Sequence, residues 1–201
     1  MPPAPLEDAQ IVRQVLRGKR DMFGLLLERY QKPIFNFIYR FYGNYDLAQE
    51  LTQETFLRCY QFLKSYDPGR KFSTWLYTVA KNLCIDELKK RKTARELPLD
   101  DAIDFVERRG ADGGPELDQQ GQAIRHEEDV KLLAALQELP SAARTVLLLH
   151  YFQGLSYQEI GETLSLPVST VKIRIFRAKK ALLEKWKGLG GEEEGPDLRG
   201  G

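Results

Sequence analysis

The sequence lacks the features that mark several large classes of protein. Its 201 residues include only two cysteines, Cys59 and Cys84, which are too few for a disulfide framework and do not have zinc-site spacing. No apolar run is long enough for a transmembrane helix, and the first residues lack the basic and apolar segments of a signal peptide. We therefore expect a cytoplasmic protein with two buried, free thiols.

Signals for catalysis are equally scarce. The only histidines, His126 and His150, are not spaced as a metal site, and no nucleophile motif or glycine-rich phosphate loop is present. The sequence thus predicts no metal site, no cofactor and no enzymatic activity. We expect both histidines to be structural or exposed.

The formal net charge of +1 hides a strong alternation along the chain. Residues 1–92 carry 16 basic and 10 acidic side chains (+6), whereas residues 93–140 carry 5 and 12 (−7). Residues 141–187 carry 8 and 3 (+5), and residues 188–201 carry 1 and 4 (−3). Two basic blocks joined by an acidic one indicate two separate contacts with a polyanion.

Helical periodicity dominates the chain, and alternating β-branched runs are few, so we predict an all-α fold. Glycine and proline signals break the first half into several helices, notably at Gly18, Gly43 and Pro68. A stretch rich in glycine, proline and acidic residues then interrupts the pattern and predicts a flexible linker between two small domains. The predicted boundaries are residues 1–92 and 126–187 for the domains, 93–125 for the linker and 188–201 for a disordered tail.

The second domain contains the pattern of a helix-turn-helix. Ser156 and Glu159 have the spacing of a capping box, and Pro167 breaks the helix that follows them. Ser169 can cap the next helix. That helix has a predicted buried stripe formed by Val171, Ile175, Ala178 and Leu182.

The face opposite this stripe is basic with some apolar residues, as in a helix that enters the major groove. A merely solvated basic face is the alternative. The capping box, the turn and the periodicity together favour DNA binding.

Two helices predicted in the first domain also have polar faces, each of which is compatible with either a binding role or simple exposure to solvent. Residues 46–63 form an amphipathic helix with a mainly acidic stripe, which is either a docking face or a solvated one. Residues 72–92 form a helix that ends in a basic run, with a core stripe of Phe72, Leu76, Val79 and Leu83. The basic run either complements the helix dipole or contacts phosphates, with Asn82 and nearby aromatic residues available to an unpaired base.

Three segments together resemble the signature motifs of extracytoplasmic-function (ECF) sigma factors, the small bacterial transcription initiation factors. They are DLAQELTQETF at 46–56, FSTWLYTVAKN at 72–82 and GLSYQEI at 154–160. The resemblance implies a σ2-like helical bundle at 1–92 and a σ4-like helix-turn-helix at 126–187. It also implies a factor that binds core RNA polymerase, directs it to −10 and −35 promoter elements and assists melting.

The same resemblance implies a role for each polar face. The residues expected to bind the β′ clamp helices of core polymerase are Asp46, Gln49, Glu50, Gln53 and Glu54. Those expected at the −10 element, with the loop at 65–73, are Phe72, Ser73, Trp75, Asn82, Lys89 and Arg91. Within that set, Asn82 is expected to hold a flipped-out base. Those expected at the −35 element are Ser169, Thr170, Lys172, Ile173, Arg174, Phe176 and Arg177.

The expected partners are core polymerase, including its β flap, promoter DNA and an anti-sigma factor that is often membrane-bound. The family also implies a stress or envelope response, a monomer when free, no small-molecule substrate and association with the nucleoid within the holoenzyme. Two other classes remain open from the residues alone. One is a regulator with a sensor domain and a response-regulator-like helix-turn-helix, and the other is an enzyme.

Overall fold

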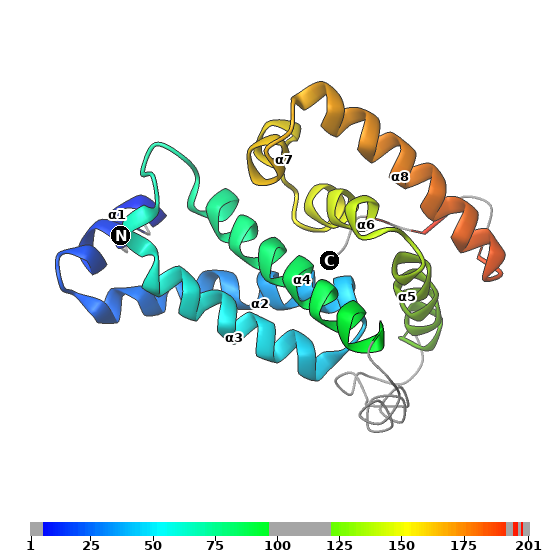
Figure 1. Cartoon of the computed structure of the whole chain (residues 1–201), viewed down its shortest axis with the longest axis horizontal. Coiled ribbons are helices and arrows are strands. Elements are labelled where there is room, and N and C mark those ends of the chain that lie inside the picture. The colour runs from blue at the N-terminus through cyan, green and yellow to red at the C-terminus, as the bar shows by residue number, and fades with distance from the viewer. Residues whose placement is uncertain (1–5, 97–121, 192–194, 197, 199–201) are drawn as a thin grey trace.

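A computed structural model describes residues 6–96, 122–191, 195, 196 and 198 of the chain. These residues contain helices and connecting turns and no strand, which confirms the predicted all-α fold (Figure 1). The helices in chain order are α1 (Asp8–Leu16), η1 (Arg20–Met22), α2 (Phe23–Tyr42), α3 (Tyr45–Gln61), η2 (Leu63–Ser65), α4 (Phe72–Glu96), α5 (Gln122–Gln137), α6 (Ser141–Leu147), the π-helical turn η6 (Leu148–Phe152), α7 (Tyr157–Leu164) and α8 (Val168–Gly188).

The first domain is a bundle in which α2 packs along α3 and both contact α4. Its core is formed largely by aromatic and branched aliphatic side chains with no exposed surface, including Phe37, Phe41 and Leu76. The predicted break between α2 and α3 is a left-handed Gly43 at φ 69°, which glycine adopts without strain. Asn44 then caps α3, since its side chain accepts a hydrogen bond from the backbone N–H of Leu47 at 2.8 Å.

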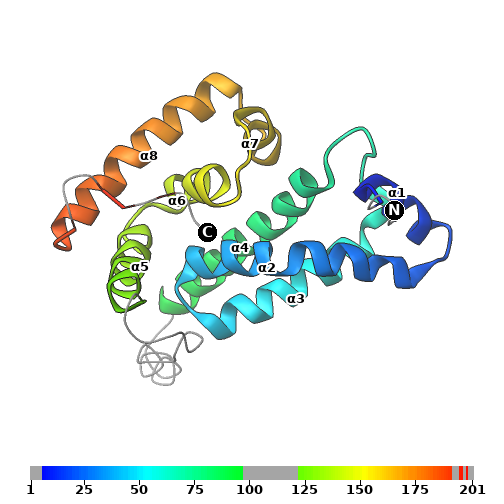
Figure 2. The ribbon, with the colours of Figure 1, turned by 180° about the vertical axis from the view of Figure 1, so that it is seen from behind.

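The second domain consists of α5 to α8, with α8 packed across α5, α6 and α7. The predicted stripe on α8 is confirmed as its buried face. Val171, Ile175, Ala178 and Leu182 are all at most 4% exposed. The opposite face of α8 points away from the rest of the molecule (Figures 1 and 2).

The observed helix ends modify the predicted boundaries. Helix α4 continues to Glu96 and α5 begins at Gln122, so both ends of the predicted linker are helical. Residues 97–121, which make up most of that linker, lie outside the described part of the chain. The sequence predicts a disordered tail after residue 187, yet Leu198 is only 7% exposed and joins the hydrophobic core.

The two domains pack against each other, which the sequence did not predict. Helix α7 lies on α4, and the C-terminal half of the chain also contacts α2 through α5, α6 and η6 (Figure 2). Periodicity within a helix shows which side is buried but not which partner buries it, so this contact has no signature in the sequence.

The predicted pair of buried, free thiols is confirmed. Burial raises the pKa of the Cys59 thiol to about 12 and also raises that of Cys84. Both therefore stay protonated and unreactive at neutral pH. Within the described ranges, no helix is both long enough and apolar enough to cross a bilayer.

Candidate nucleic-acid interface

The helix-turn-helix begins with the predicted capping box. The Ser156 N–H donates to Glu159 Oε2 at 2.8 Å, and the Glu159 N–H donates to Ser156 Oγ at 3.3 Å. Burial acts to raise the pKa of Glu159, but hydrogen bonds from Lys71 and Ser156 outweigh it and hold that pKa below its usual value. The carboxylate is therefore ionised at neutral pH and fixes the start of α7.

The turn between α7 and α8 depends on close backbone packing. A Cβ atom added at Gly161 would lie 2.8 Å from the Leu166 carbonyl oxygen, so glycine is needed there. Helix α8 begins at Val168 after Pro167, and no side chain caps it. The prediction that Ser169 caps this helix is wrong, because Ser169 already lies inside its first turn.

The outer face of α8 brings together the residues predicted to read the −35 element. Phe176 is 73% exposed and Ile173 is 52% exposed, so two large apolar side chains stand next to each other in solvent on this face. Lys172, Arg174 and Arg177 flank them, and the described part of the chain shows no ion pair for any of the three. Ser169 is exposed and Thr170 is half-buried at the start of the same helix.

An aromatic cluster of His150, Tyr151 and Tyr157 packs beside this face, and the sequence did not predict it. The His150 ring lies 4.9 Å from the Tyr157 ring and 4.8 Å from the Tyr151 ring. Lys172 Nζ lies 5.7 Å from the centre of the Tyr157 ring, a cation–π contact between α8 and α7. His150 is half-buried, and its Nδ1 lies 3.2 Å from the Leu155 carbonyl oxygen, which is a structural role.

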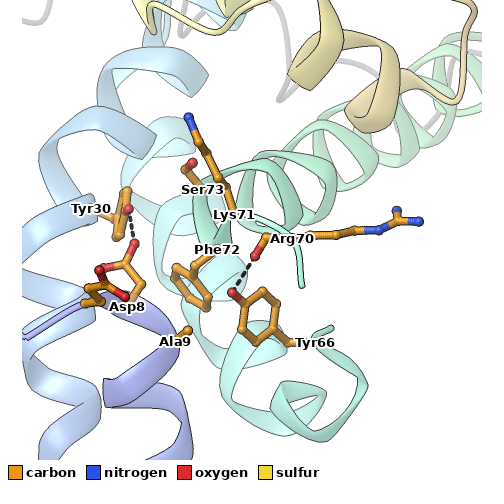
Figure 3. Close-up of a pocket in the computed structure, with 9 residues that line it drawn as sticks. Asp8, Ala9, Tyr30, Tyr66, Arg70, Lys71, Phe72 and Ser73 are labelled. Carbon is orange, nitrogen blue, oxygen red and sulfur yellow. Dashed lines mark hydrogen bonds between the residues drawn. The ribbon is translucent and has the colours of Figure 1, made fainter. Parts of the chain in front are cut away.

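A pocket of about 250 Å³ opens at the start of α4, where α1, α2 and the 65–73 loop meet (Figure 3). Ser73 lines it, as do Tyr66 and Arg70 of the loop, and the Tyr66 hydroxyl donates to the Arg70 carbonyl at 2.6 Å. Phe72, which the sequence predicts both as a core residue and as a −10 contact, also lines this pocket. It is 1% exposed and packs against the Tyr66 ring, which confirms the prediction that it belongs to the core.

The other predicted −10 residues are spread along α4. Trp75 is half-buried, whereas Asn82 is exposed and lies about 14 Å along the helix axis from Ser73. Lys89 is exposed and lies 3.8 Å from Asp86. Arg91 is half-buried and pairs with Glu87 at 2.7 Å, so its charge is partly neutralised.

The predicted acidic stripe on α3 is exposed. Asp46, Gln49, Glu50 and Gln53 all face solvent, whereas the fifth member of the set, Glu54, pairs with Arg58 at 2.7 Å. A groove of about 350 Å³ runs beside the stripe. It is lined by Glu28, Gln31, Lys32 and Phe35 of α2 and by Tyr45, Gln49, Thr52 and Gln53 of α3. The α2 residues were missed because only tertiary packing brings them beside α3.

The chain matches two protein-family models, Sigma-70 region 2 over residues 26–94 and Sigma-70 region 4 over residues 129–182. It is 35% identical over 182 residues to the ECF RNA polymerase sigma factor SigW of Bacillus subtilis, a match that covers 89% of this chain and 96% of SigW. The chain belongs to the ECF sigma-factor family. Members of this family are transcription initiation factors rather than catalysts.

Other similar proteins also align with most of the length of this sigma factor. The RNA polymerase sigma-H factor of Pseudomonas aeruginosa is 35% identical over 180 residues, with 88% of this chain and 92% of that protein covered. The solved structure of CnrH in complex with the cytosolic domain of CnrY has a TM-score of 0.66 at 23% identity and covers 90% of this chain and 97% of CnrH. That structural likeness shows the fold.

No group of three or more metal-binding side chains occurs within residues 6–96 and 122–191 or at the described tail positions. The pocket at the start of α4 and the groove between α2 and α3 are both open to solvent. The candidate sites of this sigma factor are thus exposed surfaces, namely the outer face of α8 and the α3 stripe with its neighbouring groove, and not an enclosed cavity.

Proposed function

We propose that this sigma factor binds core RNA polymerase, directs it to promoters through −10 and −35 contacts and assists strand separation. The observation that carries the proposal is the outer face of α8. Three cations and two highly exposed apolar side chains gather there, opposite a fully buried stripe. Such a face suits the edges and phosphates of a major groove.

For the −35 element, we assign base and phosphate contacts to Lys172, Arg174 and Arg177. Ile173 and Phe176 are suited to thymine methyl groups or sugars, since exposed apolar groups gain by covering such surfaces. To Ser169 and Thr170, at the start of α8, we assign contacts with backbone phosphates, since a helix N-terminus favours anions.

For the −10 element, we assign the pocket at the start of α4 and the exposed side of that helix. Ser73 lines the pocket, and the exposed Asn82 is our candidate for a flipped-out base. Trp75 is available through its half-exposed ring, and Lys89 for a phosphate. The burial of Phe72 and the ion pair of Arg91 favour structural roles for these two residues.

For core polymerase, we assign the α3 stripe and extend it to the neighbouring α2 groove. Gln49 and Gln53 belong to both features, which makes the combined surface continuous. The arrangement needs no catalysis by the chain itself, because trapping an unstacked base costs only a few kcal/mol.

We also propose an anti-sigma factor as a regulatory partner, with the free factor located in the cytoplasm. The structure of the sigma factor RpoE from Bartonella quintana in complex with the anti-sigma factor NepR supports this partner class. The RpoE structure has a TM-score of 0.65 at 23% identity.

Run-off transcription with purified core polymerase on a promoter library tests the function. We expect initiation from a defined subset of templates only when this sigma factor is added. Binding to duplex DNA without polymerase, with no initiation, would instead indicate a conventional regulator.

The core-binding surface is tested by reversing two of its charges. We expect Asp46→Lys with Glu50→Lys to weaken core binding about tenfold or more, since like charges at an interface lower both affinity and association rate. Glu162→Lys, a reversal on exposed α7, is the control and leaves core affinity unchanged. An unaltered dissociation constant for the double variant would make the α3 stripe a solvated surface.

A further inference from the structure

The excess positive charge of the first domain is concentrated in one short segment. Residues 13–20 contain four basic and no acidic side chains, and they therefore supply +4 of the +6 carried by residues 1–92. The four cations, which we call the α1 patch, are Arg13, Arg17, Lys19 and Arg20. The patch contains none of the residues assigned to promoter DNA or to core polymerase.

The charges of the α1 patch are exposed and uncompensated. All four side chains face solvent, and none of them forms an ion pair with another described residue. The cations near the end of α4 differ in this respect. Lys89 lies 3.8 Å from Asp86, and Arg91 pairs with Glu87 at 2.7 Å. The α1 patch is therefore better suited than this part of α4 to attract a polyanion.

A tight turn presents the cations of the patch as one ordered surface. Gly18 is left-handed at φ 97°, and its N–H donates to the Val15 carbonyl at 2.9 Å. The Lys19 N–H donates to the Gln14 carbonyl at 3.1 Å. These bonds close the end of α1 and lead directly into η1, so cations from both helices are held on either side of one turn.

The dipole of α1 explains only part of this patch. Arg13 and Arg17 lie in and just after the last turn of α1, where a cation is favourable. However, they are four residues apart, a spacing at which like charges repel each other on a helix. Arg20 instead begins η1, where the dipole favours an anion. Such a cluster is more stable with an anion bound, which is typical of a polyanion-binding surface.

The α1 patch is continuous with the pocket at the start of α4. Ala9 lines that pocket, and its carbonyl accepts a hydrogen bond from Arg13 Nε at 3.2 Å. Arg17 lies about 6 Å further along the helix axis than Arg13. Asp8 also lines the pocket, but its carboxylate is paired with Arg29, so it does not cancel the charge of the patch.

The position of α1 indicates which part of a promoter could reach the patch. Asp8 and Ala9 border the pocket on one side, and α4 leads away from it on the other (Figure 3). Helix α1 also forms the end of the first domain that is farthest from α5 to α8 (Figures 1 and 2). Because α4 leads toward the domain assigned to the upstream −35 element, α1 lies where DNA downstream of the −10 element leaves the pocket.

We propose that the α1 patch binds the phosphates of the separated DNA strand immediately downstream of the −10 element. This inference rests on the proposed function, which places that strand in the pocket. Arginine pairs with a phosphate through two parallel hydrogen bonds, and lysine supplies a mobile point charge. Phosphate contacts position a strand without reading its bases. A duplex that carries the −35 element without a separated strand does not engage the patch, so its affinity is independent of these cations.

The proposal is tested by binding the holoenzyme to two partly single-stranded templates made from a promoter that run-off transcription has identified. In the short template the separated strand ends with the −10 element. In the long template it continues for about six nucleotides, within the usual size of a single-strand site. The measured quantity is the ratio of the two affinities, determined by fluorescence anisotropy at several salt concentrations.

We expect wild type to bind the long template more tightly than the short one. Lys19→Ala with Arg20→Ala should reduce the ratio about threefold or more, since two cations no longer release counterions from the strand. The slope of log affinity against log salt for the long template should fall by about 1.4, or 0.7 for each lost contact with a single strand. Changing the bases of the extension should leave the ratio unaltered.

Lys90→Ala with Lys92→Ala is the matched control, because it removes the same charge at the far end of α4. This variant should keep the wild-type ratio, whatever its affinity for either template. Uncharged methylphosphonate linkages in the extension provide a second control. They should lower the ratio of wild type to that of Lys19→Ala with Arg20→Ala and change the ratio of that variant much less.

The proposal is overturned if the Lys19 and Arg20 double variant keeps the wild-type ratio. It is also overturned if this variant loses affinity for core polymerase without DNA, which would make the patch a protein interface. Loss of binding to phosphatidylserine vesicles at an unchanged ratio would assign the patch to a membrane surface instead. Failure of the proposed function abolishes binding to the short template as well, whereas failure of this proposal leaves it intact.

Discussion

Helices α4 and α8 both carry residues for which the family resemblance implies DNA contacts, but these residues differ in how far they are exposed. On α8, Phe176 is 73% exposed and stands among Lys172, Arg174 and Arg177, whereas on α4, Phe72 is 1% exposed inside an aromatic cluster. The α8 face is open to solvent, and α4 is partly covered by α7. The resemblance thus points to a helix, whereas tertiary packing decides which residues of that helix are exposed.

The largest expected difference is between Phe72→Ala and Phe176→Ala. Removing the buried Phe72 ring leaves a cavity and should lower the free energy of unfolding by about 3–5 kcal/mol. Phe176→Ala should change it by less than about 0.5 kcal/mol but reduce transcription from a −35-dependent promoter. Chemical denaturation and run-off assays measure the two effects, and equal stability losses would contradict the contrast.

Gly161→Ala tests how strictly the turn holds α8 against α7. The added methyl group meets the Leu166 carbonyl oxygen, which is backbone and cannot rotate away, so we expect a destabilisation of about 1–3 kcal/mol. Gly24→Ala, in α2, is the control because a Cβ there has no neighbour within 4 Å. Thermal melting should separate the pair, and a melting temperature for Gly161→Ala as high as that of Gly24→Ala would show that the turn is adaptable.

Arg177→Ala tests whether the exposed α8 face reads DNA. We expect holoenzyme binding to a −35-containing duplex to weaken by about 1–3 kcal/mol, with core affinity unchanged. Lys172→Ala should act in the same direction. Arg17→Ala removes one exposed arginine from the loop after α1 and should leave DNA binding intact. Electrophoretic mobility shifts at fixed salt measure the effect, and equal affinity of Arg177→Ala and Arg17→Ala would remove α8 from the interface.

The smallest expected effect is the pH dependence of the contact that covers α4. The pKa of Glu159 is lower in the folded protein than in the unfolded chain, so its stabilising contribution is present above the ordinary carboxyl pKa of about 4. That contribution is lost as the pH falls through the depressed folded value. The free energy of unfolding, measured by chemical denaturation between pH 7 and pH 3, should therefore fall more steeply for wild type than for Glu159→Gln. Identical pH profiles for the two proteins would exclude Glu159 as the group responsible.

Much of the fold was predictable because helix periodicity and capping are local properties. The stripe on α8 and the capping box at Ser156 follow from residues a few positions apart, and both are confirmed. Helix ends were less predictable, since α4 continues to Glu96 through residues assigned to the linker. The prediction that Ser169 caps α8 was wrong because the helix begins at Val168, directly after Pro167, so that Ser169 lies in its first turn.

The candidate site was predictable only where exposure follows from the opposite face being buried. That condition holds on α8, whose outer residues are exposed together. It does not hold for Phe72, whose burial depends on Tyr30 and Tyr66 from other segments. Helix periodicity also could not reveal the α2 side of the groove, because Gln31 and Lys32 lie beside α3 only in the folded bundle.

By itself, the sequence determined the helical class, the two domain-sized blocks, the helix-turn-helix and the family motifs. Each of these depends on spacing along one segment of chain, where backbone geometry repeats every 3.6 residues. Only the tertiary structure decided that Arg144 reaches the end of α2 and that Lys71 meets Glu159 across the domains. Contacts between residues so distant in sequence carry no periodic signal, because they depend on how completed helices pack.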